Sequence, residues 1–157
     1  RVYACHQGAR HAETPAVTAL LAREKNFGLQ DVSRYATFQE EVKTVKRDLL
    51  AFLIEAKRAG KRVAGYGAPA KGNTLLNYCG VRTDFLDFTV DRNPHKQNTW
   101  LPGTRIPVLD PEAVRIQKPD YLLILPWNIR DEVMEQMAHI REWGGKFVVP
   151  IPKLQVI

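Results

Sequence analysis

Residues 62–78 read RVAGYGAPAKGNTLLNY, and this stretch decides the fold. It begins with the short apolar run 62–66, continues through a glycine-rich turn that ends at Gly72, and becomes helical over 71–78. A strand, a glycine-rich turn and a helix in this order are typical of the first half of a βαβ unit, in which a helix connects two parallel strands. The stretch therefore predicts an α/β domain with a parallel sheet.

The sequence that follows this unit alternates short apolar runs with helical patterns, which favours a Rossmann-like three-layer domain with a mostly parallel sheet. Further strands are expected at residues 85–90, 106–108, 121–125 and 146–149, and further helices at residues 110–116 and 131–143. Ligands in such sheets bind at the carboxyl ends of the strands. The turns that follow the strands are therefore the candidate binding elements.

Two helical segments precede this domain. Thr14 and Pro15 have the pattern of an N-cap with proline at the first helical position, and they predict a short helix over 16–27. Apolar residues at three- and four-residue steps predict a long amphipathic helix over 38–59, which Gly60 ends.

These patterns divide the sequence into two parts. Residues 1–36 are expected to be a linker and short helical arm, and residues 37–157 the Rossmann-like domain with its long leading helix. Residues 1–5 have no initiating Met and read as the tail of a strand. We therefore expect the sequence to begin inside a longer protein.

Composition narrows the function classes. The net charge is +6, but the Lys and Arg residues are scattered, so a phosphorylated small molecule is a better expected partner than nucleic acid. Two cysteines favour a reducing cytoplasm, and no clustered His/Cys pattern predicts a metal site. No apolar run reaches the ~20 residues that a membrane span needs.

The glycine-rich turn has the context of a phosphate-binding loop. Small residues let the backbone approach a phosphate, and the following helix would present free N–H groups beside the Lys71 ammonium. The third glycine is late and Pro69 lacks a donor, which argues against a standard dinucleotide site; a tight turn without a ligand stays open. The candidate binding residues here are Gly65, Tyr66, Gly67, Ala68, Lys71, Gly72 and Asn73.

Two more turns supply candidate residues. Asp91 ends the second predicted strand, where such folds place an acid on a ribose hydroxyl, and Asn93 and Lys96 would share its rim; the alternative is an aspartate that caps the turn. Trp127 and Asn128 follow a central strand and would contact a sugar or base. Alternatively, Trp127 packs on its neighbours and Asn128 caps the next helix.

Three motifs together resemble a known family. GYGAPAKGNTLLN (65–77), TVDRNP (89–94) and LPWN (125–128) are similar to the C-terminal domain of S-adenosylmethionine-dependent sugar C-methyltransferases. The resemblance covers nearly the whole sequence. It implies that a zinc-binding N-terminal region and a methyltransferase domain, which holds S-adenosylmethionine, lie upstream of Arg1.

The resemblance also implies a division of labour. The substrate would be a keto-deoxysugar carried on a nucleoside diphosphate, deprotonated beside its ketone and methylated by S-adenosylmethionine. The present domain would bind and orient that nucleotide-sugar beside its own upstream methyltransferase domain, with no cofactor and no catalytic residue of its own. His6 would face the shared cleft. The domain alone would be catalytically incomplete.

Two other functions stay open from the sequence. One is a nicotinamide- or nucleotide-binding regulatory module, in which the glycine-rich turn contacts a dinucleotide. The other is a non-catalytic dimerisation domain, in which the helix over 38–59 supplies the contact face.

Overall fold

The structure is a computed structural model that describes residues 3–157. The described residues divide into two compact units, and the division falls between Glu41 and Val42. The boundary lies inside the long helix α3 (Phe38–Arg58), so each unit is described by itself.

The N-terminal unit is built from short helices and has no buried side chain among its described residues. Helix α1 (Pro15–Asn26) starts at the predicted proline, and α2 (Val32–Ala36) starts where the Asp31 carboxylate accepts a hydrogen bond of 2.9 Å from the Ser33 N–H. The predicted N-terminal strand is wrong for residues 3–5, which belong to no strand; Arg1 and Val2 lie outside the described residues.

Helix α3 follows the predicted amphipathic pattern. Its apolar stripe places Leu49, Leu53 and Ala56 in the core of the C-terminal unit, while its charged residues are exposed or partly exposed. The stripe that a dimerisation helix would need is therefore covered by the domain's own sheet over this part of the helix. The backbone turns at Gly60, which has a φ of 69°.

Described residues of the C-terminal unit form a seven-stranded sheet with the order β3-β4-β2-β1-β5-β6-β7. The five inner strands are parallel, whereas β3 and β7 pair antiparallel at the two edges. The strands are β1 (Val63–Tyr66), β2 (Thr89–Val90), β3 (Thr99–Trp100), β4 (Pro107–Leu109), β5 (Tyr121–Ile124), β6 (Lys146–Val149) and β7 (Gln155–Val156).

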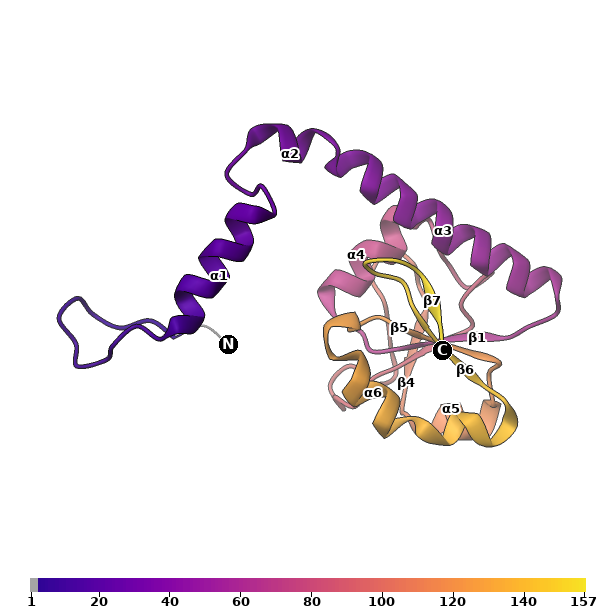
Figure 1. Cartoon of the computed structure of the whole chain (residues 1–157). Helices are drawn as coiled ribbons and strands as arrows, with labels where there is room; N and C mark the ends of the chain where they lie inside the picture. The colour runs from indigo at the N-terminus through magenta and orange to yellow at the C-terminus, as the bar shows by residue number, and fades with distance from the viewer. Residues whose placement is uncertain (1–2) are drawn as a thin grey trace. The chain divides into compact units, whose positions relative to one another are not determined.

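Helices cover both faces of this sheet (Figure 1). Helix α4 (Ala70–Cys79) packs beside α3 on one face, and α5 (Glu112–Gln117), α6 (Arg130–Gln136) and the 3₁₀ helix η2 (Ala138–Trp143) pack on the other. Each face has its own apolar cluster. The predicted Rossmann-like three-layer α/β class with a mostly parallel sheet is therefore confirmed. None of the helices among the described residues is long and apolar enough to span a bilayer.

The largest differences from the sequence prediction concern the second strand, the two edge strands and the helix predicted over 131–143. The second strand is limited to β2, because residues 83–85 form a turn. The edge strands β3 and β7 were not predicted, since two residues are too few to show an alternating pattern. The helix predicted over 131–143 breaks at Met137 into α6 and η2, where the Ile140 N–H bonds to the Met137 carbonyl in the tighter 3₁₀ pattern.

The strand order fixes where a ligand would bind. The backbone leaves β1 toward β2 on one side, and it later returns through α5 to β5 on the other side of β1. The order therefore reverses between β1 and β5, and open α/β sheets bind ligands at the carboxyl ends of strands at such a point. The turns after β1, β2 and β5 meet there.

Candidate functional site

Gly67 lies where the turns after β1 and β5 come into contact. Its φ of 88° is a left-handed value, and its N–H donates a hydrogen bond of 2.6 Å to the Val90 carbonyl. A Cβ at this position would lie 2.7 Å from Cδ of Pro126. Both the backbone angle and the lack of space therefore require glycine here.

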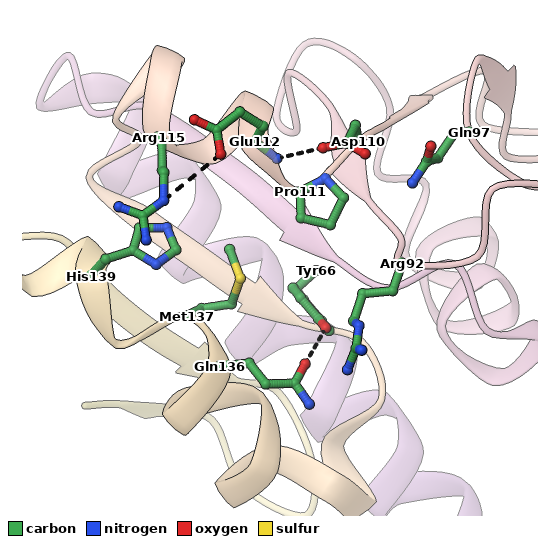
Figure 2. Close-up of a pocket in the computed structure, with 10 residues that line it drawn as sticks. All are labelled: Tyr66, Arg92, Gln97, Asp110, Pro111, Glu112, Arg115, Gln136, Met137 and His139. Atoms are coloured by element: carbon green, nitrogen blue, oxygen red, sulfur yellow. Dashed lines mark hydrogen bonds and ion pairs between the residues drawn. The ribbon is translucent and has the colours of Figure 1, made fainter.

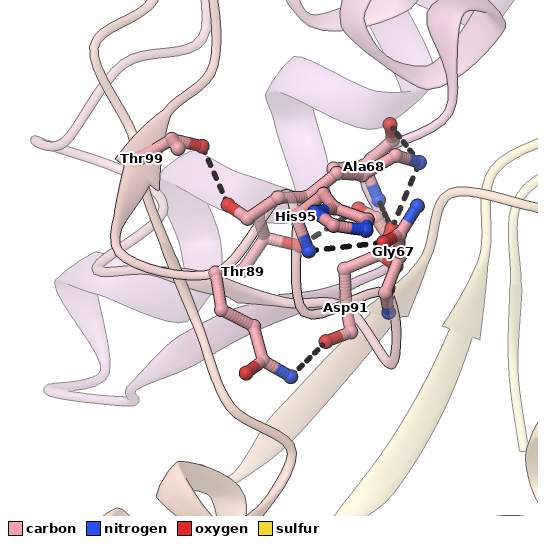
Figure 3. Close-up of polar contacts among 9 residues, drawn as sticks. Gly67, Ala68, Thr89, Asp91, His95 and Thr99 are labelled. Atoms are coloured by element: carbon pink, nitrogen blue, oxygen red, sulfur yellow. Dashed lines mark hydrogen bonds and ion pairs between the residues drawn. The ribbon is translucent and has the colours of Figure 1, made fainter.

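Asp91 closes the glycine-rich turn from the end of β2 (Figure 3). Its carboxylate accepts hydrogen bonds from the Ala68 N–H at 2.7 Å and the Asn93 N–H at 2.8 Å. The Lys96 ammonium donates to the same carboxylate at 3.2 Å and to the Ala68 carbonyl at 3.0 Å. The Asp91 carboxylate thus already accepts the hydrogen bond from the Ala68 N–H, a donor that a bound phosphate would otherwise use.

The same contacts set the ionisation of Asp91. Partial burial by itself raises the pKa of this carboxyl, but the hydrogen bonds from Asn93, Ala68 and Lys96 together lower it below its ordinary value of 3.8. These donors stabilise the charged form. Asp91 is therefore ionised at neutral pH, and both of its oxygens are engaged within the protein.

Two adjacent cavities open beside this turn, on the face covered by α5 and α6. The smaller, of about 270 Å³, lies over Gly67, Asp91 and Pro126. The larger, of about 500 Å³, extends between α5 and η2 (Figure 2). Both are lined by Tyr66, Arg92 and Gln136, so we describe them as one cleft with two lobes.

A series of hydrogen bonds crosses the floor of the cleft. The Tyr66 hydroxyl donates to Gln136 Oε1 at 2.8 Å, and Gln136 Nε2 donates to the Glu132 carboxylate at 2.9 Å. Burial raises the pKa of Tyr66, so the phenol stays protonated at neutral pH and keeps this donor role. The amide of Gln136 is thereby held in one orientation at the boundary of the two lobes.

A second polar group lies beside the turn after β5. The Lys71 ammonium lies 4.5 Å from the centre of the Trp127 ring and donates a hydrogen bond to the side-chain oxygen of Asn128. A cation over an indole face is attracted by the ring quadrupole. This contact ties α4 to the turn after β5.

Comparison with known proteins identifies the family. The family model described as "C-methyltransferase C-terminal domain" matches residues 1–152. The protein belongs to this family. The resemblance inferred from the three sequence motifs is confirmed at this level.

A curated relative of this C-methyltransferase C-terminal domain is the C-methyltransferase NovU of Streptomyces niveus, with 38% identity over 156 residues. The alignment covers 99% of the present sequence but only 37% of that protein's length. Among solved structures, UDP-D-quinovosamine 4-dehydrogenase from Vibrio fischeri is similar with a TM-score of 0.45 and 18% identity, over 62% of the present sequence and 93% of the other.

The structure brings part of the predicted binding set together in the cleft. Tyr66, Gly67, Asp91 and Lys96 line it. Gly65 and Gly72 instead make close packing possible, since a Cβ on either would lie 2.7 Å from Thr89 or from Leu125, respectively. The other predicted residues, which do not line the two lobes, are Ala68, Lys71, Asn73, Asn93, Trp127 and Asn128.

The predicted contact of His6 stays a prediction. This exposed residue belongs to the N-terminal unit, whereas the cleft is built entirely from the C-terminal unit. Zinc and S-adenosylmethionine are likewise untested. The Asp91 carboxylate, the acid expected to face a nucleotide ribose, accepts hydrogen bonds from Ala68, Asn93 and Lys96.

Several residues that line the cleft were not predicted from the sequence. The signal for Arg92 was its position next to Asp91 at the carboxyl end of β2, but Gln97, Arg115 and Gln136 had no local signal. His139 forms part of the wall of the larger lobe (Figure 2). Burial lowers its pKa, and its Nε2 has no partner among the described residues.

Acid should weaken the Asp91 contacts. The folded-state pKa of Asp91 lies below the unfolded value of 3.8, so its contribution to stability is present above that value and is lost as pH falls through the folded pKa. We expect the difference in unfolding free energy between wild type and Asp91→Asn to be largest near pH 7 and to narrow below about pH 4. Urea unfolding at several pH values measures it. A difference independent of pH would contradict the assignment.

Proposed function

We propose that this protein is the substrate-binding C-terminal domain of an S-adenosylmethionine-dependent C-methyltransferase that acts on a keto-sugar linked to a nucleotide. Family membership carries this proposal, together with a relative that is named a C-methyltransferase. The cleft at the carboxyl end of β1 supports it, because its size and polar lining suit a hydroxylated, phosphorylated small molecule.

In the proposed reaction, this domain binds the nucleotide-sugar and orients it. The upstream methyltransferase domain would hold the methyl donor, and the region before that domain would hold zinc. The whole enzyme would act in the cytoplasm. Orienting two reactants removes several kcal/mol from a barrier, up to roughly 7–11 kcal/mol in ideal cases. A domain that only positions the sugar can therefore have a large effect on rate without a catalytic residue.

The lining of the cleft is suited to sugar hydroxyls. Tyr66 and Gln136 present a fixed series of donors and acceptors, and Glu132 and Asp110 add carboxylate oxygens. Carboxylates accept hydrogen bonds from sugar hydroxyls, and side-chain amides both accept from and donate to them, so such a lining can orient a sugar. We propose that Lys71, Trp127 and Asn128 form the outer rim on the opposite side of Gly67.

The upstream methyltransferase domain is the proposed protein partner. The N-terminal unit exposes the large apolar side chains of Leu21, Phe27 and Val32, each more than half exposed. We propose that this partner covers these exposed apolar side chains. The described residues of this unit bury no side chain among themselves.

Calorimetric titration of the 157-residue protein with a thymidine or uridine diphosphate sugar should show weak, saturable binding. Lys71→Ala should weaken it by up to about fivefold, because one exposed charge contact is worth about 1 kcal/mol or less. Lys146→Ala is the matched control, since Lys146 lies at the opposite end of the sheet, on the first residue of β6.

Two outcomes would contradict the proposal. Absence of nucleotide-sugar binding to the protein would remove its substrate-binding role. Tight retention on an immobilised nicotinamide dinucleotide, without nucleotide-sugar binding, would instead identify a dinucleotide-binding regulatory module.

A further inference from the structure

The glycine-rich turn offers few free donors to a phosphate. The Gly67 N–H bonds to the Val90 carbonyl, the Ala68 N–H bonds to Asp91, and Pro69 has no N–H. A phosphate bound here would have to displace the Asp91 carboxylate, which is also held by Lys96. The N–H groups at the start of α4 belong to Ala70, Lys71 and Gly72, which do not line either lobe, so an anionic group inside the cleft needs another donor.

Most charged groups of the cleft are already engaged. Lys96 pairs with Asp91 at 3.2 Å, and Arg115 lies 3.8 Å from Glu112 within α5. Asp110 accepts the Glu112 N–H at 2.8 Å. The charges of these groups are therefore largely compensated by contacts within the protein.

Arg92 is the exception among the cations that line the cleft. Within residues 3–157, its guanidinium forms no hydrogen bond, ion pair or aromatic-ring contact. It lines both lobes, and Figure 2 shows it reaching from the turn after β2 toward the Tyr66 hydroxyl. Its charge is thus placed at the boundary between the lobes, beside the oriented amide of Gln136.

We propose that Arg92 is the anion-binding residue of the cleft and that it binds a phosphoryl group of the ligand. This inference rests on the proposed substrate-binding function. A guanidinium presents a planar fork that donates two parallel hydrogen bonds to phosphate oxygens, which an engaged backbone turn does not offer. The phosphates would then lie at the boundary of the lobes, with uncharged parts of the ligand on either side.

Titration of the 157-residue protein with uridine diphosphate, and separately with inorganic pyrophosphate and uridine, tests the inference. Arg92→Gln should weaken binding of uridine diphosphate and pyrophosphate by about tenfold or more, because a charge-assisted hydrogen bond is lost. Uridine binding should change little, and Arg92→Lys should lose less than Arg92→Gln. Arg58→Gln, at the exposed C-terminal end of α3, removes the same charge outside the cleft and should have no effect.

The outcomes separate this inference from the proposed function. Phosphate binding that Arg92→Gln leaves unchanged would overturn the role of Arg92, while nucleotide-sugar binding would still support the proposed function. Equal losses in Arg92→Gln and Arg58→Gln would reduce the effect to net charge and also overturn it. No binding of either phosphate probe to wild type would overturn the inference, and the nucleotide-sugar titration then decides the proposed function separately. Circular dichroism and amide shifts at Gln97 confirm that the variants are folded.

Discussion

Gly67→Ala is expected to destabilise the domain by about 2–5 kcal/mol. A left-handed backbone costs an L-residue about 1–2 kcal/mol, and overpacking typically adds about 1–3 kcal/mol. Both effects apply, because the φ is 88° and the new Cβ would lie 2.7 Å from Cδ of Pro126. Relief of this clash would push the turns after β1 and β5 apart. Urea unfolding and nucleotide-sugar titration together measure the loss of stability and of the cleft.

Gly80→Ala is the matched control for this prediction. Gly80 also has a left-handed φ, of 75°, but nothing lies within 4 Å of the position its Cβ would take. Its replacement should therefore cost only the backbone term of about 1–2 kcal/mol and leave ligand binding intact. Equal destabilisation in the two variants would mean that the turns do not meet at Gly67.

The second large effect is expected from Asp91→Ala, which should lower the unfolding free energy by about 2–4 kcal/mol. The side chain of Asp91 is only 14% exposed, and it is the acceptor for the N–H groups of Ala68 and Asn93. A buried donor left without an acceptor costs about 1–3 kcal/mol, and Lys96 would lose its ion pair as well. Thermal and urea unfolding measure the change.

Asp110→Ala is the control for the loss of a capping carboxylate. Asp110 is exposed and accepts one backbone N–H, from Glu112, so its removal should cost about 1 kcal/mol. A similar small cost for Asp91→Ala would show that Asp91 is an ordinary turn cap and does not hold the glycine-rich turn. Tighter phosphate binding by Asp91→Ala than by wild type would support the view that the Asp91 carboxylate occupies a phosphate position.

The competing interpretations of Asp91 illustrate what a sequence leaves open. One placed it on a ligand ribose and the other had it cap the turn at Asn93. The structure shows the Asn93 cap together with a long-range contact to Ala68, which no local pattern announces. The choice depended on how close β1 and β2 bring their ends, since Gly65 pairs with Thr89.

Local order was determined by the sequence by itself. The alternation of apolar runs and helical periods, together with Pro15, Gly60 and the glycine-rich turn, predicted helices α1, α3, α4 and α5 and the five inner strands. The same patterns indicated the carboxyl end of the sheet as the candidate binding edge. These features depend on periodicity and backbone preference, which act over a few residues. The three motifs also indicated the family, which the family model then confirmed.

Only the tertiary structure decided the composition of the cleft. It brought Arg92, Gln136 and His139 together from the turn after β2, from α6 and from η2. Of the glycines predicted to bind a ligand, only Gly67 lines the cleft, whereas Gly65 and Gly72 allow close packing. Such groupings depend on strand order and helix packing between segments far apart in the sequence, and short sequence patterns carry no record of them. The glycine-rich turn was therefore found from its sequence, but its closure by Asp91 required the fold.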